Sequence, residues 1–217
     1  MRNKYKPKID KIITLAEQLP YFGFDDLIPI EKNKTYLAIL LSRYTKRGKL
    51  IRLKKGLYVA KKYIDETQKT NSFSVYLEFI ANILYQPSYL SLDYILYFHN
   101  ILTELPVNFT LVVSAKKTIV FSNELGNFYY HKIKDELFCG FKIIEENNLT
   151  ILKATKAKAL FDFLYFRKNV LINKKTTQEL RLNMDNFTKN DLKEFKKYLK
   201  IEGSKKMKQI YIWLFVK

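Results

Sequence analysis

The sequence predicts a mixed α/β (α+β) protein: an N-terminal winged helix-turn-helix over residues 1–65, followed by a mixed α+β domain over residues 72–217. Three observations lead to this prediction. Residues 32–62 contain a helical pattern, a glycine and a basic two-strand hairpin, in that order. That stretch holds eleven Lys or Arg and no Asp or Glu. From residue 74 onward, helical and strand-like spacing alternate, after a polar stretch at 61–71 that reads as a linker or domain boundary.

The positive charge is concentrated near the N-terminus. The 217 residues carry a formal net charge of +18. Residues 1–65 hold sixteen basic and six acidic residues, whereas the longer remainder holds twenty-three and fifteen. An excess of this kind predicts a polyanionic partner, most often nucleic acid. A genome rich in AT would also raise the Lys content, so the distribution of charge carries more weight than its total.

Residue types that support catalysis or metal binding are scarce. The chain has one cysteine, Cys139, and two histidines, His99 and His131. These counts exclude a disulfide framework and do not supply the ligand pattern of a structural zinc site. No nucleotide-binding glycine loop, HExxH motif or nucleophile triad is visible. We therefore expect neither an enzyme nor a bound cofactor or metal, with His99 and Cys139 buried in the core and His131 partly exposed.

No segment of the sequence reads as a targeting signal or a membrane span. The Lys-rich N-terminus lacks an apolar stretch followed by small residues. No uncharged apolar run reaches about 18 residues. We expect a cytoplasmic protein without a membrane partner.

The N-terminal domain begins with two predicted helices. Ile9, Ile12, Ile13 and Ala16 form one apolar stripe on a helix over residues 8–19, which Pro20 ends. A second, short helix is expected at residues 24–28. It would brace the helix that follows.

Asn33 is a good N-cap for that third helix. Leu37, Leu40, Leu41 and Tyr44 form its inner face, and Gly48 ends it. A hairpin follows at residues 50–53 and 57–59, with a glycine in its Lys54-Lys55-Gly56 turn.

This helix and hairpin are the predicted interface with double-stranded DNA. Contacts to base edges are expected from four outward, uncharged residues: Thr35, Ala38, Ile39 and Ser42. Contacts to phosphates are expected from Lys34, Arg43, Lys46, Arg47, Arg52, Lys54 and Lys55, and Lys32 and Asn33 complete the interface. The aromatic content of 15% also suggests base stacking on RNA. Most of the aromatic residues fall in apolar stripes, which favours a role in the core.

The C-terminal domain should mix helices with short strands. Helices are expected over residues 74–85, from Ser91 to about 99, over 155–166 and 190–200, and from Ser204 onward, with Ser91 and Ser204 as caps. Strands are expected at 109–113, 118–121, 128–133, 140–144 and 150–152. Residues 177–182 are compatible with either type.

Three stretches together resemble the AbiEi-like antitoxins of type IV toxin–antitoxin systems. The first is the helix end and hairpin, with Gly56-Leu57-Tyr58-Val59. The second is residues 87–96 with His99-Asn100; Ser88 and Asn100 stand where that family usually has glycine. The third runs from Leu152 to Tyr165 and includes Ala154-Thr155-Lys156-Ala157-Lys158; Lys156 and Ala157 replace the family's usual Pro-Glu, whereas Lys158 matches its Lys.

The resemblance covers most of the chain and implies a function. It implies an N-terminal domain that represses its own operon at inverted repeats, and a C-terminal domain that antagonises a nucleotidyltransferase-like toxin, directly or indirectly. Candidate residues for the second role are Lys153, Lys156, Lys158 and Arg167, for which a solvated helix face is an equally good reading. A stand-alone transcriptional regulator of the same architecture, without a toxin partner, is the alternative.

Overall fold

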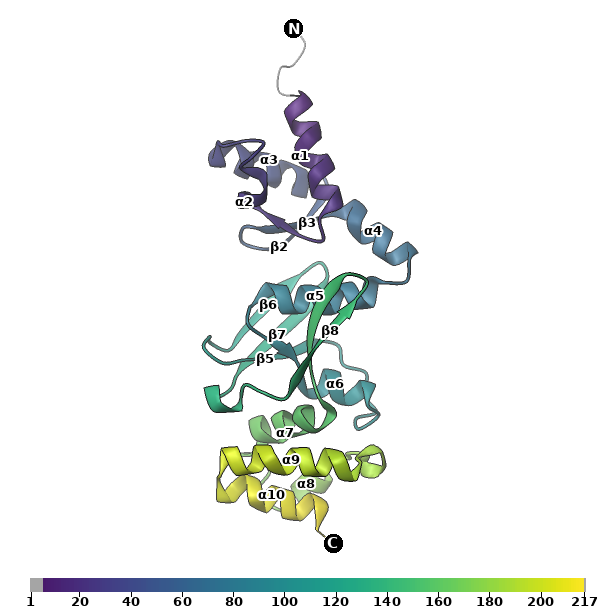
Figure 1. Ribbon diagram of the computed structural model, residues 1–217, viewed down its shortest axis with the longest axis vertical. Helices are drawn as coiled ribbons and strands as arrows, with labels where there is room; N and C mark the ends of the chain where they lie inside the picture. The colour runs from purple at the N-terminus through teal and green to yellow at the C-terminus, as the bar shows by residue number, and fades with distance from the viewer. Residues whose placement is uncertain (1–5, 217) are drawn as a thin grey trace. The chain divides into compact units, whose positions relative to one another are not determined.

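The computed structural model describes residues 6–216 and has a mixed α/β fold (Figure 1). The chain divides into two compact units. The first unit comprises Met1–Leu77 with Phe121–Gly126, and the second comprises Glu78–Val120 with Asn127–Lys217.

The first unit combines helices with a small antiparallel sheet. The strand order in this sheet is β1-β3-β2. Figure 1 shows the first three helices gathered on one side of the β2–β3 hairpin. The elements in chain order are α1 (Lys6–Gln18), β1 (Phe22–Gly23), α2 (Phe24–Leu27), α3 (Lys34–Lys46), β2 (Leu50–Lys54), β3 (Leu57–Ala60) and α4 (Lys61–Lys69).

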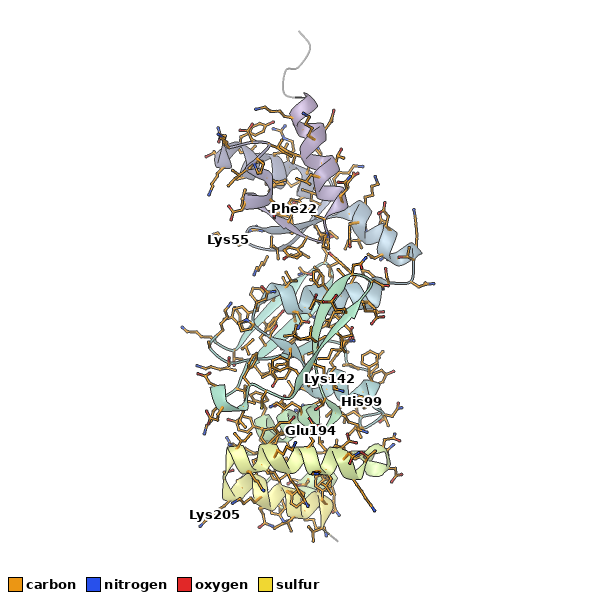
Figure 2. The ribbon with its side chains drawn as sticks, viewed as in Figure 1. Phe22, Lys55, His99, Lys142, Glu194 and Lys205 are labelled. Atoms are coloured by element: carbon orange, nitrogen blue, oxygen red, sulfur yellow. The ribbon has the colours of Figure 1, made fainter. Side chains whose placement is uncertain are left out.

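The core of this unit joins α1, α3 and the hairpin. Ile12 and Ala16 of α1 are buried, as the sequence spacing predicted. They share one cluster with the buried leucines of α3 and with Leu50 and Tyr58 of the hairpin. Figure 2 labels Phe22 of β1, which is fully buried in the same cluster. This core fixes which side of α3 faces outward.

The stretch at residues 61–71, which the sequence marked as a linker or domain boundary, is mostly helical. Helix α4 occupies Lys61–Lys69. Only Ile64 and Thr67 are buried, which explains the polar composition. Lys61 and Asp65 form an ion pair of 3.2 Å one turn apart. Such pairs stabilise exposed helices that bury little apolar surface.

A six-stranded mixed sheet belongs to the second unit, apart from residues 121–126 at the end of β6 and the start of β7, which are grouped with the first unit. Its strand order is β6-β7-β5-β4-β9-β8. The β4–β9 and β5–β7 pairs are parallel, whereas the β4–β5 and β8–β9 pairs are antiparallel. The strands are β4 (Tyr89–Leu90), β5 (Phe109–Val113), β6 (Ile119–Asn123), β7 (Gly126–Lys132), β8 (Phe141–Glu146) and β9 (Leu149–Ala154).

One helix precedes the strands of this sheet in the chain, one lies between β4 and β5, and the others follow β9. The helices are α5 (Phe73–Leu84), α6 (Leu92–Phe98), α7 (Lys156–Arg167), α8 (Lys174–Gln178), α9 (Lys189–Glu202) and α10 (Lys205–Phe215), with short 3-10 turns at Asp135–Leu137 and Met184–Asn186. Residues 177–182, which the sequence left undecided, contain the end of α8. The predicted Ser204 cap is confirmed, because its Oγ accepts a hydrogen bond of 3.2 Å from the Met207 amide.

Two expectations about buried residues are wrong. His99 is exposed (Figure 2), because α6 ends at Phe98 and the histidine lies beyond the stripe of Leu92, Ile95 and Leu96. Cys139 is partly exposed. Leu137, two residues earlier, is the buried residue of this turn. His131 is partly exposed, as expected.

Within residues 6–216, no helix has both the length and the apolar character needed to cross a membrane.

Candidate nucleic-acid interface

Helix α3 is held in place by its cap and by its inner face. The Asn33 side-chain oxygen accepts a hydrogen bond of 3.0 Å from the Tyr36 amide, which confirms the predicted cap. Leu37, Leu40 and Leu41 are buried, and Tyr44 is partly buried. The helix is therefore anchored along one side over its whole length.

The opposite side of α3 is open and carries no acid. Thr35, Ala38, Ile39 and Ser42 are all exposed, and Ile39 keeps 55% of its surface accessible. A shallow depression on this side is lined by Ala38, Ile39, Ser42, Arg43, Lys46 and Arg47. Small hydroxyl and apolar side chains flanked by cations suit a DNA major groove, where base edges offer hydrogen-bonding atoms and thymine methyl groups.

The hairpin continues the positive charge beyond α3. Gly48, which ends the helix, has φ +68°, and Gly56 at the hairpin turn has φ +79°. Both values lie in the left-handed region that glycine adopts without steric cost. A register irregularity between Arg52 and Lys54 marks a bulge in β2. Arg52 and Lys55 are exposed, and Figure 2 labels Lys55 at the turn, whereas Lys54 is partly buried.

Among the predicted contact residues, seven exposed cations lack an ion-pair partner within the described part of the chain. We call them the unpaired cation set: Lys32, Lys34, Arg43, Lys46, Arg47, Arg52 and Lys55. By contrast, the nearby Lys8, Lys61 and Lys62 pair with Glu31, Asp65 and Glu17. Like charges left without counter-charges repel one another, and a polyanion that neutralises them gains binding free energy through counterion release.

Two carboxylates lie close to part of this set. Asp25 and Asp26 line a depression together with Lys34 and Gly56, which places the hairpin turn beside the start of α3. The Asp26 carboxylate accepts a hydrogen bond of 2.7 Å from the Gly23 amide and so caps α2. Glu31 precedes α3, and its pKa is lowered mainly by the hydrogen bond from the Asn33 amide. These acids have structural partners or lie outside the open side of α3.

The second set of candidate residues is placed differently. Lys153 pairs with Glu78 at 2.5 Å, Lys156 with Asp191 at 2.8 Å, Lys158 with Asp162 at 2.5 Å and Arg167 with Asp93 at 3.0 Å. Each cation is thus neutralised within the second unit. Lys158 is fully buried, so it cannot belong to a solvated or partner-binding surface.

Lys158 belongs to a buried cluster that the sequence reading missed. The Asp162 carboxylate also accepts hydrogen bonds from the Tyr89 hydroxyl at 3.0 Å and from the Ser91 hydroxyl at 2.8 Å. Ser91 lies at the predicted N-cap position of α6, but its side chain makes no capping hydrogen bond, because its hydroxyl donates to the carboxylate. The Lys158 ammonium also lies 5.0 Å from the Phe161 ring centroid. The available signal was a Lys–Asp pair one turn apart within the otherwise apolar middle of α7.

Burial controls the electrostatics of this cluster. It raises the pKa of the Asp162 carboxyl, and the Lys158 ammonium and the two hydroxyl donors oppose that rise. Burial also raises the pKa of the Tyr89 phenol, and the adjacent carboxylate adds to the effect. The three donors stabilise the buried carboxylate, and removing any of them would leave part of its charge without a hydrogen-bond partner and destabilise the fold.

Across residues 6–216, no three His, Cys, Asp or Glu side chains come together in a way that could hold a metal ion.

Searches with protein-family models and against curated proteins found no significant match to this chain.

Proposed function

We propose that the first unit is a winged helix-turn-helix that binds double-stranded DNA, with α3 in the major groove and the β2–β3 hairpin as the wing. The element order from α1 to β3 and the β1-β3-β2 sheet are compatible with that fold. The observation that carries the proposal is the unpaired cation set around an exposed, acid-free helix side. A partner that supplies regularly spaced phosphates and a groove as wide as a helix fits both features.

Within this proposal the side chains divide into two roles. The unpaired cations contact phosphates and set affinity without reading sequence. Thr35, Ala38, Ile39 and Ser42 contact base edges and set preference. Asn33 contributes through its amide nitrogen, because its side-chain oxygen is already used by the helix cap. Lys54, being partly buried, is the weakest of the predicted phosphate contacts.

For the whole chain, we propose a non-enzymatic antitoxin and transcriptional autorepressor of a type IV toxin–antitoxin operon. It would bind an operator with inverted repeats and antagonise a nucleotidyltransferase-like toxin, directly or indirectly. The AbiEi-like resemblance supports this proposal. Tyr89 and Ser91 come from its second stretch, and Lys158 and Asp162 come from its third. Their meeting in one buried cluster gives these separated motifs a common structural reason.

The buried cluster has a structural role in the second unit and does not provide a contact surface for a toxin. Lys153, Lys156 and Arg167, which are partly exposed, remain the candidate contacts for the antitoxin role. Lys158 cannot have that role, because its side chain is fully buried and no partner can reach it. Any toxin that used the other three would compete with the acids that now hold them.

A stand-alone transcriptional regulator is the alternative proposal. It rests on the same interface in the first unit, while the toxin link rests on resemblance alone. Co-expression with the product of a neighbouring nucleotidyltransferase gene separates the two. Restored growth of cells poisoned by that product favours the antitoxin, and unrelieved growth arrest favours the stand-alone regulator.

DNA binding is tested by fluorescence anisotropy with the duplex upstream of the protein's own gene. We expect binding that weakens steeply as salt rises, because counterion release dominates affinity. An RNA hairpin and a single-stranded RNA of equal length serve as competitors. Stronger binding to either of these RNAs than to the DNA duplex would contradict the proposal and favour base stacking on aromatic side chains.

A further inference from the structure

Strand β8 leaves one side of the six-stranded sheet open. It is the terminal strand in the sheet order of the described residues and pairs only with β9. Lys142, Ile143, Glu145 and Glu146 are exposed, and Ile143 keeps 67% of its surface accessible. Figure 2 labels Lys142 on this strand. A six-residue edge with an exposed β-branched residue is a template for another strand.

The register with β9 shows which backbone groups are open. Glu146 pairs with Leu149 across the two-residue Asn147-Asn148 turn. The Gly140 carbonyl accepts a hydrogen bond of 2.9 Å from the Thr155 amide, which follows β9. Gly140 lies six residues, an even number, before Glu146, so both residues direct their backbone groups to the same side of the strand. Backbone groups of alternate residues point to opposite sides in an antiparallel pair. Even-numbered residues of β8 therefore face β9, and Phe141, Ile143 and Glu145 present their amides and carbonyls to the open edge.

The side chains of β8 are complementary to a second, antiparallel copy of the same strand. In a two-fold arrangement, residues that face each other must lie on the same side of the sheet. With the axis beside Ile144, each Lys142 faces Glu146 of the other copy, and the two Ile144 side chains face each other. Ile143 then faces Glu145 of the other copy, and both present open backbone groups. The register thus combines two ion pairs, one apolar pair and four main-chain hydrogen bonds.

We propose that β8 is a dimerisation strand that joins two copies of this chain into one continuous sheet. A second copy is favoured over a foreign strand because the Lys142–Glu146 complementarity is internal to the sequence of β8. Six-residue strands bury little area, so the dimer forms with a Kd in roughly the micromolar range. If the proposed function holds, a two-fold dimer matches the symmetry of an inverted repeat. The dimer itself does not depend on DNA binding.

Charge reversal on the full-length protein, without DNA, tests the register. Lys142→Glu places four carboxylates at the two former ion pairs, and Glu146→Lys places four ammonium groups there. Each variant alone should weaken dimerisation by about tenfold or more. An equimolar mixture of the two variants should dimerise as the wild type does, because every pair in the mixed dimer is again of opposite sign. Lys117→Glu is the control: it makes the same charge change at an exposed position outside β8.

Sedimentation equilibrium over about 1–200 µM protein measures the outcome. The wild type and the Lys117→Glu control should rise from 25.9 kDa toward twice that mass. Circular dichroism melting of each variant verifies that the fold is intact. A wild type that stays monomeric over the whole range would overturn the proposal, as would single variants that dimerise like the wild type or a mixture that fails to recover. Loss of DNA binding alone would bear only on the proposed function.

Discussion

Removal of two hairpin cations gives the sharpest test of the proposed DNA contact. Arg52 and Lys55 are exposed and have no ion-pair partner among the described residues. The double variant Arg52→Ala/Lys55→Ala removes two phosphate contacts. Because surface substitutions of this kind usually change stability by less than about 0.5 kcal/mol, the melting temperature should stay nearly constant.

The magnitude follows from counterion release. Each neutralised phosphate contributes about −0.9 to the slope of log affinity against log salt. If all seven members of the unpaired cation set contact phosphates, the wild-type slope is about −6, and the double variant has a slope of about −4.5. Between 50 and 200 mM salt, the wild type then loses roughly twelvefold more affinity than the variant does. The two affinities should therefore converge as salt rises.

Fluorescence anisotropy with one duplex at four or five salt concentrations measures both slopes. The matched control is Lys61→Ala/Lys62→Ala, which removes the same charge from residues that pair with Asp65 and Glu17. Its slope should stay close to that of the wild type. Equal slopes for Arg52→Ala/Lys55→Ala and the wild type would refute the assignment of the hairpin as a wing. A control slope that falls as much as the hairpin variant would show that only net charge matters.

Three further substitutions probe other parts of the chain. Ile39→Glu should abolish duplex binding and leave the melting temperature unchanged, because the side chain is exposed on the open side of α3; anisotropy and melting measure the two. Lys158→Ala should cost about 3–5 kcal/mol in urea unfolding at pH 7, because it strands the buried Asp162 carboxylate, whereas Lys158→Met/Asp162→Leu should recover much of that loss. Burial raises the pKa of the Asp162 carboxyl, and Lys158→Ala lacks the ammonium that opposes this rise, so the folded variant binds a proton at Asp162 more tightly than the unfolded chain does. The free energy of unfolding that the variant loses relative to the wild type should therefore become smaller as pH falls from 7 to 5. A loss that grows over this pH range would contradict the reasoning. Gly140→Ala should destabilise by about 2 kcal/mol or more, because Gly140 has φ +76° and an added Cβ would collide with the Tyr198 hydroxyl; Cys139→Ala beside it, measured in the same urea series, should cost less.

Local patterns predicted the elements of the first unit well. The stripe of Leu37, Leu40 and Leu41, the Asn33 cap and the glycines at 48 and 56 each act within a few residues, so the sequence carries their signal directly. The same logic failed for α4. Its helix depends on exposed pairs such as Lys61–Asp65 and buries few residues, so an apolar stripe was too weak to see.

Long-range partners explain what the sequence could not predict in the second unit. Strands β5 to β9 were predicted, but β4 was not, and the order β6-β7-β5-β4-β9-β8 depends on pairings between segments far apart in the chain. A surface role for Lys158 followed from its charge alone. Its burial depends on Asp162 one turn away and on hydroxyls from β4 and its flank, more than 60 residues earlier. Composition cannot distinguish a solvated lysine from one enclosed by such partners.

The Asp162 carboxylate joins β4, the residue before α6 and the interior of α7. Any opening that exposes one of these segments must break hydrogen bonds that belong to the others, so partial unfolding gains little. We therefore expect the backbone amides near Leu90 and Phe161 to exchange with deuterium at a common rate, set by global unfolding of the second unit. The amides of α10, which lies outside the cluster, should exchange earlier.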